Sequence, residues 1–161
     1  MAGRRARPLP ANRMNLTIHR AGPADLDALA AMFDAYRQFY GQPADVPRAR
    51  DWLRSRLRLG ESVVLLARRD GRLVGFAQLY AGFSSIRTDR TWILNDLFVE
   101  PPARRSGVAR ALLDAAADFA REDGAVSISL ETARDNQAAR AAYRAAGWVE
   151  DQTQWYSLAL R

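Results

Sequence analysis

The hydrophobic positions of the chain alternate between the two-residue period of strands and the three-to-four-residue period of helices. Residues 15–20 alternate and predict a first strand. Pro23 then opens a helical stretch that ends at Gly41. One apolar face runs along this helix through Leu26, Leu29, Phe33, Tyr36 and Tyr40. A second helix is predicted over 46–59, with an inward face made of Val46, Trp52, Leu53 and Leu57.

The middle of the chain has the pattern of a hairpin followed by a buried strand. Two β-rich runs, 62–69 and 72–81, flank the turn signal Asp70-Gly71. A polar loop over 82–89 leads to a strand over 90–99, whose apolar run is too continuous for simple alternation. We therefore expect a hairpin and at least one central strand here.

The remaining segments alternate strongly between helix and strand. A helix over 108–122 presents Val108, Leu112, Ala116 and Phe119 on one face. A strand over 125–131, a helix over 136–146 and two short strands near 148–151 and 154–160 follow. The order β-α-α-β-β-β-α-β-α-β-β predicts an α/β (α+β) domain with a mixed sheet flanked by helices. We assign residues 15–161 to this single domain and residues 1–14 to a basic, disordered tail.

The composition excludes several kinds of chemistry. The chain has no cysteine and one histidine, which excludes thiolate and poly-histidine metal sites and cysteine nucleophiles. All its basic residues are arginines, so neither a P-loop lysine nor a Schiff-base lysine exists. The net charge of +6 arises largely in residues 1–13, so no nucleic-acid partner is expected, although binding through this tail is an alternative. No apolar run approaches the length of a membrane span, and we expect a cytoplasmic protein.

The segment from Val99 to Leu113 predicts an anion site. A buried strand runs through a short loop directly into a helix, and Ser106, Gly107 and Ala109 let a ligand approach the backbone. The first amides of a helix lack internal partners and carry partial positive charge, which favours phosphate oxygens. The alternative is a tight strand-to-helix turn with its arginines in solvent. Walker and dinucleotide motifs do not fit, because lysine and further glycines are missing.

At this segment the sequence resembles the GNAT superfamily of acetyl-CoA-dependent N-acetyltransferases. The resemblance rests on Asn95-Asp96-Leu97-Phe98-Val99-x-Pro101 and on Arg104-x-x-Gly107-x-Ala109. A second block runs from Leu130-Glu131-Thr132 through Asn136, Ala139 and Tyr143 to Gly147-Trp148. The resemblance implies a mostly antiparallel sheet of about seven strands with about four helices, splayed between strands 4 and 5. It also implies acetyl-CoA as co-substrate, held at Leu97, Phe98, Val99, Arg104, Arg105, Ser106, Gly107, Val108, Ala109, Arg110, Asn136, Ala139 and Tyr143.

The resemblance implies acetyl transfer to an amine, and the chemistry then needs a base, an oxyanion donor and an acid. Asp96 and Glu131 are the candidate bases, while Asp96 has an alternative role as a hydrogen-bonded strand-end carboxylate. A backbone amide near Phe98 or Val99 is expected to face the thioester carbonyl. Tyr143 is the expected proton donor to the leaving sulfur, its alternative being a packing aromatic. The chain has Asn95-Asp96 where relatives acting on polyamines often carry two acids.

The acceptor is expected to be the primary amine of an amino-acid-like or polyamine-like small molecule. Aromatic rings could surround its ammonium group before it loses a proton. The residues assigned to this pocket are Tyr36, Tyr40, Tyr80, Phe83, Ser84, Trp92 and Asn95. A protein or peptide amine as acceptor, a non-catalytic acyl-CoA-binding module, and a homodimer through the terminal QWYSLAL segment are left open. No metal is expected.

Overall fold

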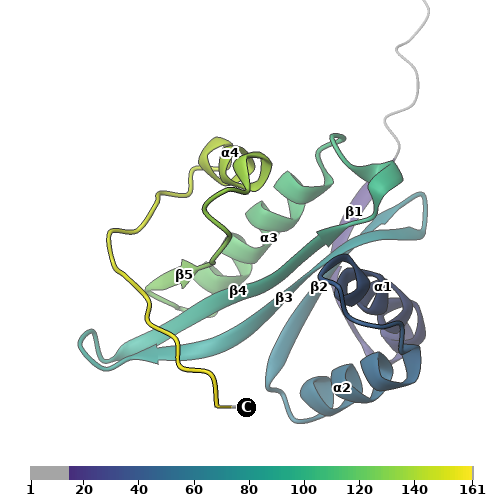
Figure 1. Ribbon diagram of the computed structural model, residues 1–161, viewed down its shortest axis with the longest axis horizontal. Coiled ribbons are helices and arrows are strands. Elements are labelled where there is room, and N and C mark those ends of the chain that lie inside the picture. The colour runs from purple at the N-terminus through teal and green to yellow at the C-terminus, as the bar shows by residue number, and fades with distance from the viewer. Residues whose placement is uncertain (1–14, 161) are drawn as a thin grey trace, which may run out of the picture.

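The computed structural model describes residues 15–160, so the predicted tail over 1–14 lies outside the described residues. Figure 1 shows the elements along the chain. The strands are β1 (Leu16–Arg20), β2 (Ser62–Arg69), β3 (Arg72–Ser84), β4 (Asp89–Val99) and β5 (Ser127–Ser129). The helices are α1 (Leu26–Phe39), α2 (Val46–Arg58), α3 (Val108–Glu122) and α4 (Gln137–Ala145), with short 3-10 turns η1 (Pro23–Asp25) and η2 (Pro101–Ala103).

The strands form one mixed sheet in the order β1-β2-β3-β4-β5. The first four are antiparallel, and β5 runs parallel to β4. The predicted Asp70-Gly71 hairpin is confirmed, since Arg69 pairs with Arg72 across the turn. The expectation of about seven strands is wrong: the described part of the chain has five.

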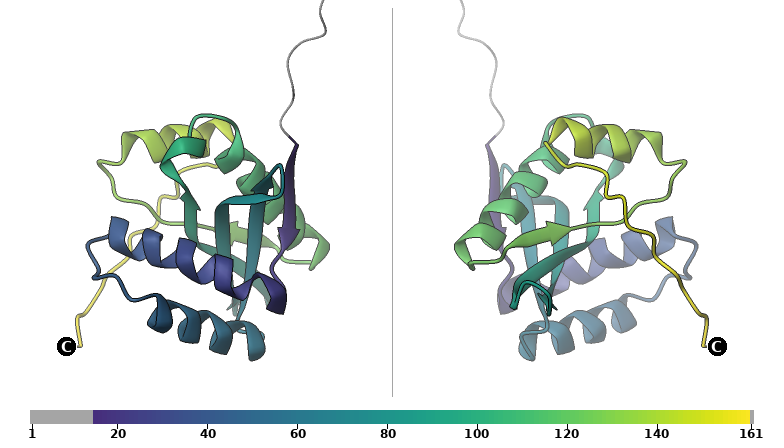
Figure 2. Two further views of the ribbon diagram at one scale, coloured as in Figure 1. Left: turned by 90° about the vertical axis from the view of Figure 1, so that its right-hand side faces the viewer. Right: turned by 90° about the vertical axis from the view of Figure 1, so that its left-hand side faces the viewer.

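Helices cover both faces of the sheet (Figure 2). Leu29, Phe33 and Leu53 from α1 and α2 pack with Phe76 and Phe98 of the sheet into one buried cluster. On the opposite face, α3 packs its own apolar residues against a second cluster of side chains from β2, β3 and β4. Alternate residues of the central strands feed these two clusters, which explains why β2 and β3 have continuous apolar runs in the sequence.

Two sequence predictions on α2 are wrong. Val46 and Trp52 were expected to face inward, but they are 43% and 47% exposed. Ala49 and Leu53 form the buried face instead, so the helix needs only a narrow apolar stripe. The Trp52 ring lies outside this stripe, with the Arg56 guanidinium 4.5 Å above its centroid.

The C-terminal part of the described chain has fewer and shorter strands than the sequence predicted. The strand expected over 125–131 is shorter, and the expected strands near 148–151 and 154–160 are not formed. All residues from 149 to 160 are exposed, and no residue from 121 to 160 is buried. In the described chain none of these residues pairs with the free edge of β5, so the sheet ends at this strand.

A β-bulge in β4 decides which residues face which helix layer. Gln78 pairs with Asp96 while Leu79 pairs with Leu94, so Asn95 is the additional residue. Before the bulge, Leu94 faces the α3 layer, and after it Phe98 faces the α1 layer. Asp96 therefore points to the α1 side, where it meets Tyr36 of α1.

Candidate active site

The loop between β4 and α3 is a cradle of free backbone amides. Arg105 and Gly107 both have left-handed backbone conformations, with φ of 56° and 86°. Ala111 makes the first helical hydrogen bond, to the carbonyl of Gly107. Within residues 15–160, the amides from Arg105 to Arg110 therefore donate to no protein acceptor. Such a concave run of amides at a helix N-terminus binds anions.

Side chains hold this loop in place from three directions. Arg104 Nε donates to the Val99 carbonyl at 2.9 Å, and its guanidinium lies over the rings of Phe39 and Phe98. Ser106 Oγ donates to the Ala103 carbonyl, and Arg69 donates to Ser106. The Arg104 side chain thus fixes the loop to β4 and to the end of α1 rather than pointing into the cradle.

Arg110 also has a structural role in this structure. Its Nε donates to both carboxylate oxygens of Asp114, and Nη1 donates to the Ala145 carbonyl at 2.7 Å. It therefore ties α3 to the C-terminal end of α4. Arg105, by contrast, forms no ion pair among residues 15–160, so its guanidinium is free beside the cradle.

The Asp96 carboxylate is the centre of the second part of the site. Asp96 is 7% exposed and accepts hydrogen bonds from Tyr36 Oη at 2.8 Å and from Gln78 Nε2 at 2.7 Å. Asn95, whose side chain is exposed, donates a third at 3.1 Å. No arginine of the described chain pairs with Asp96. A buried carboxylate without a cationic partner favours a ligand that supplies positive charge.

Tyrosines from three elements surround this carboxylate. Burial raises the pKa of Tyr36, and the negative charge of Asp96 raises it further. Burial and then Asp96 likewise raise the pKa of Tyr80, while a hydrogen bond from Trp52 acts in the opposite direction. Burial raises the pKa of Tyr143 on α4, with Tyr40 as the second cause. Tyr36, Tyr80 and Tyr143 therefore lie around one space and keep their protons at neutral pH.

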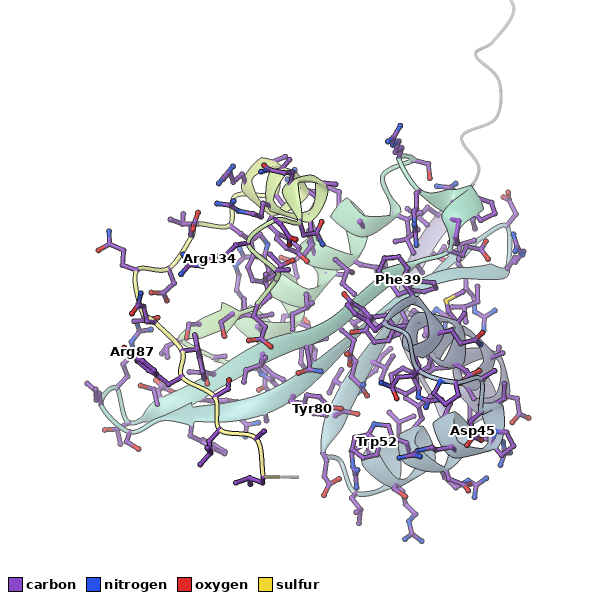
Figure 3. The ribbon with its side chains drawn as sticks, viewed as in Figure 1. Phe39, Asp45, Trp52, Tyr80, Arg87 and Arg134 are labelled. Carbon is purple, nitrogen blue, oxygen red and sulfur yellow. The ribbon has the colours of Figure 1, made fainter. Side chains whose placement is uncertain are left out.

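Figure 3 shows where two parts of this space come from: Tyr80 and Trp52 lie close together between β3 and α2, while Phe39 marks the end of α1. Tyr36 packs edge-on against Tyr40, with ring centroids 5.1 Å apart. Tyr36 also contacts the buried rings of Phe76 and Phe98. Aromatic rings and one buried carboxylate therefore lie together here.

The sheet opens next to Asp96. Strands β4 and β5 pair only over Thr91–Ile93 and Ser127–Ser129. Glu100 N–H donates to Val74 on β3, and amide directions alternate along a strand, so Val99 N–H points away from β3. It faces the unpaired side of β4, between Asp96 and the amide cradle.

Several predicted site residues lie elsewhere. Trp92 is buried on the α3 side of β4, where it contacts Phe119 and donates to Asp123 at 2.9 Å. Phe83 and Ser84 are at the far end of the β3–β4 hairpin, five residues or more from Gln78, or roughly 17 Å along the strand. Phe83 is 77% exposed, beneath the guanidinium of Arg90.

The residues predicted around α4 have mainly structural contacts. Asn136 is the N-cap of α4 and accepts from the Ala139 amide at 3.2 Å. Glu131 is exposed and has no hydrogen bond or ion pair within the described residues. Leu97, Val108 and Ala109 contribute side chains to the α3 cluster, so only their backbone reaches the ligand side.

Gln78 is the site residue that sequence reasoning missed. It is fully buried, yet its Oε1 has no partner while its Nε2 holds Asp96. The signal was present as a single polar residue inside the apolar run RLVGFAQLYA. A buried polar residue in such a run requires a partner, and that partner is the carboxylate on the neighbouring strand.

The domain therefore combines an open α/β sheet, an anion-binding loop directly after β4 and a buried carboxylate on β4. These features define a class of α/β domains that bind a phosphate-containing ligand beside a second, cationic one. Residues 28–148 match the model of the acetyltransferase (GNAT) family, so the chain belongs to this family and is an acetyltransferase. The chain is 43% identical over 136 residues to the uncharacterised N-acetyltransferase YhfO of Bacillus subtilis strain 168, covering 84% of this chain and 91% of the relative.

Two further comparisons agree. The chain is 31% identical to a type 1 aminoglycoside N(6')-acetyltransferase of Stenotrophomonas maltophilia, over 84% of this chain and 88% of the relative. It matches the crystal structure of a probable acetyltransferase with a TM-score of 0.86 and 43% identity, over 90% of this chain and 98% of that one. Within residues 15–160, no helix is long and apolar enough to cross a membrane, and no three side chains group as metal ligands.

Proposed function

We propose that the protein transfers the acetyl group of acetyl-CoA to the primary amine of a small molecule, by direct attack in a ternary complex. The observation that carries the proposal is the Asp96 carboxylate, buried without a cationic partner at the point where β4 leaves β5. The name of the aminoglycoside relative supports a small amine as the acceptor. Acetyl-CoA supplies an acyl group activated as a thioester.

The amide cradle fits the phosphate end of this co-substrate. The free amides from Arg105 to Arg110 and the guanidinium of Arg105 provide donors and positive charge for a pyrophosphate. The left-handed conformation at Gly107 directs these amides to one side. The chain would hold the carbonyl oxygen of the acetyl group with Val99 N–H, a preorganised donor for the negative charge that develops there.

Asp96 and the tyrosines act on the acceptor. The aromatic rings and the carboxylate attract an alkylammonium group, and the carboxylate then receives its proton. The free amine forms the N–C bond, the C–S bond breaks as the thiolate leaves, and the nitrogen releases its second proton, which returns through solvent to the Tyr143 oxygen after that residue has protonated the sulfur. Tyr143 gives its proton to that sulfur; its raised pKa keeps it protonated until this step.

The test is thiol release, because a chain without cysteine contributes no thiol of its own. The protein is incubated with acetyl-CoA and separate pools of aminoglycosides, amino acids, polyamines and a lysine peptide. Release that depends on a small-amine pool supports the proposal. Release with the lysine peptide alone, or tight acetyl-CoA binding with no release for any amine, contradicts it.

A further inference from the structure

Helix α2 brings a guanidinium to the edge of the space around Asp96. The Arg56 guanidinium lies 4.5 Å from the centroid of the Trp52 ring. Trp52 donates a hydrogen bond to Tyr80, and the two rings lie close together between β3 and α2 (Figure 3). Tyr80 and Gln78 are two residues apart on β3, so their side chains share one face, and Gln78 holds Asp96.

The Tyr80 hydroxyl is close to both charged groups. Burial is the largest cause of its raised pKa, but the negative charge of Asp96 raises the pKa of Tyr80 further and the positive charge of Arg56 lowers it. A carboxylate and a guanidinium thus lie near one tyrosine, on β4 and α2 respectively. A ligand beside Tyr80 meets one protein group of each sign.

The Arg56 guanidinium has donors available for a ligand. Its Nε donates to the Glu61 carboxylate, and within residues 15–160 neither of its Nη groups donates to a protein acceptor. The side chain is only 23% exposed, so bulk water screens its charge weakly. A guanidinium presents its donors in a planar fork that matches the two oxygens of a carboxylate. The Nη side of this fork is therefore suited to a second carboxylate.

The charge of α2 disfavours an acceptor with several ammonium groups. This helix contains five arginines and one aspartate, a net charge of +4. Within the described chain Arg48 and Arg58 form no ion pair, and Arg56 pairs only with Glu61, whose side chain is 48% exposed. Further ammonium groups of a polyamine would lie against this positive helix, which costs Coulomb energy and selects against such amines.

We infer that the acceptor carries a carboxylate as well as its amine, Asp96 binding the ammonium group and Arg56 the carboxylate. The inference rests on the proposed function, because it names the substrate class for the same site. Trp52, which is 47% exposed, and Tyr80 line the path between the two charged groups. A phosphate monoester, with a charge of about −2, would be only half neutralised by one guanidinium. The substrate class is therefore an amino acid or a longer aminocarboxylate, and Arg56 is its specificity residue.

The first experiment compares acceptors that differ only in this negative charge. The common α-amino acids, β-alanine and γ-aminobutyrate are each compared with the corresponding carboxamide in the thiol-release assay, at equal concentrations of protonated amine. For at least one pair the acid is expected to have a KM at least about tenfold lower than its carboxamide, since hydrogen bonds between charged groups are the stronger ones. Equal KM values in every pair, or a diamine that is a better acceptor than the acids, overturn the inference.

The second experiment uses two variants that break the same ion pair and are expected to act in opposite directions. Arg56→Gln should lower the ratio of kcat/KM for the acid to that for its carboxamide at least about tenfold. Glu61→Gln removes the competing carboxylate and should raise this ratio at least about twofold. Arg54→Gln, on the same helix and paired with Asp51, is the control and should leave the ratio unchanged. If both Arg56→Gln and Glu61→Gln change the ratio in the same direction, or neither changes it, the pair is only structural and the inference is wrong.

A binding measurement separates this inference from the proposed chemistry. Calorimetric titration of the acid and its carboxamide into the protein saturated with coenzyme A involves no acetyl transfer. Tighter binding of the acid that Arg56→Gln abolishes supports the inference even if no amine releases thiol, and then only the proposed function fails. Equal binding of the acid and the carboxamide, together with thiol release for other amines, overturns the inference and leaves the proposed function intact.

Discussion

The replacement of Asp96 by asparagine is the most direct test of the proposed chemistry. An alkylammonium has a pKa of about 10.4, so freeing its lone pair at pH 7.4 costs about 4 kcal/mol at 1.36 kcal/mol per pH unit. A positioned general base contributes typically about 10²–10⁴-fold to the rate. We expect kcat/KM for the amine to fall by this factor in Asp96→Asn, while the KM for acetyl-CoA changes less than about threefold, because the cradle from Arg105 to Arg110 is untouched.

The structure indicates that this variant folds normally. Asparagine keeps one carbonyl oxygen to accept from Tyr36 Oη. Its new NH₂ group would face Gln78 Nε2, but the Gln78 amide can rotate and present its unpartnered Oε1 instead. The three hydrogen bonds of Asp96 then change from charge-assisted to neutral, while the cost of burying the carboxylate charge disappears, so the free energy of unfolding should change by about 1–2 kcal/mol. A lost activity therefore reports on the proton transfer.

The assay is steady-state thiol release between pH 6.5 and 9.5. If Asp96 accepts the ammonium proton, the deficit of Asp96→Asn narrows toward high pH, where solution provides the free amine. Asp89→Asn, the same change at the start of β4, is the control and should keep full activity, because among residues 15–160 the Asp89 carboxylate accepts a hydrogen bond only from the Arg90 amide. A deficit that is constant with pH, or below fivefold at pH 7.4, would refute the assignment of Asp96 as the base.

Three further predictions follow from single side chains. Gly107→Val should raise the KM for acetyl-CoA at least tenfold and lower the free energy of unfolding by about 1–2 kcal/mol, since valine is strained at a φ of 86°. Gly124 has a φ of 75° and, like Gly107, no atom within 4 Å of an added Cβ, but it lies outside the site. Gly124→Val should therefore lose the same stability and bind acetyl-CoA normally. Tyr143→Phe should lower kcat without changing acetyl-CoA affinity, and an unchanged kcat would remove Tyr143 as the acid. Because burial raises the pKa of Tyr143, the native enzyme should lose no activity from ionisation of this residue below pH 10. Burial alone would raise the pKa of Asp34, but hydrogen bonds from the Asp45 amide, Gln38 and Arg37 lower it overall. Its stabilisation is therefore complete above the ordinary carboxyl pKa of 3.8 and is lost as pH falls through the lowered pKa of the folded state. In urea unfolding, Asp34→Asn should be weaker than the native chain by about 2–3 kcal/mol at pH 7, and this gap should narrow as pH falls below 3.8. A gap independent of pH contradicts this.

The local periodicity of the sequence was sufficient for most of the fold. The turn at Asp70-Gly71 and the helix over 108–122 have strong local signals, and both are confirmed at the predicted positions. The strand predicted over 72–81 continues to Ser84, into the segment predicted as a polar loop. The failures arise where long-range packing decides. Trp52 fits an inward position by hydrophobicity, but Ala49 and Leu53 already fill the space beneath α2. The apolar alternation at 154–160 predicts a strand, yet a strand forms only beside a partner edge.

The candidate site was predictable where backbone chemistry defines it. The cradle around Gly107 follows from a strand, a short loop and a helix with small residues, all visible in the sequence. The side-chain partners within the site could not be predicted from the sequence. The direction of Arg104 depends on Phe39 and Phe98, which are distant in sequence, and the burial of Trp92 depends on Phe119 and Asp123. Three-dimensional neighbours of this kind have no local signal.

The bulge at Asn95 lets β4 hold one residue more than β3 without changing the pairs on either side of it. Leu94 pairs with Leu79 and Asp96 pairs with the adjacent Gln78, so removing Asn95 would leave a regular ladder with Asp96 still on the α1 side. Such a deletion should remove the hydrogen bond from Asn95 to Asp96 and the local irregularity of the strand, but not the position of the carboxylate. When related chains are aligned, a gap of one residue between Leu94 and Asp96 is therefore compatible with a carboxylate that keeps its partners Tyr36 and Gln78.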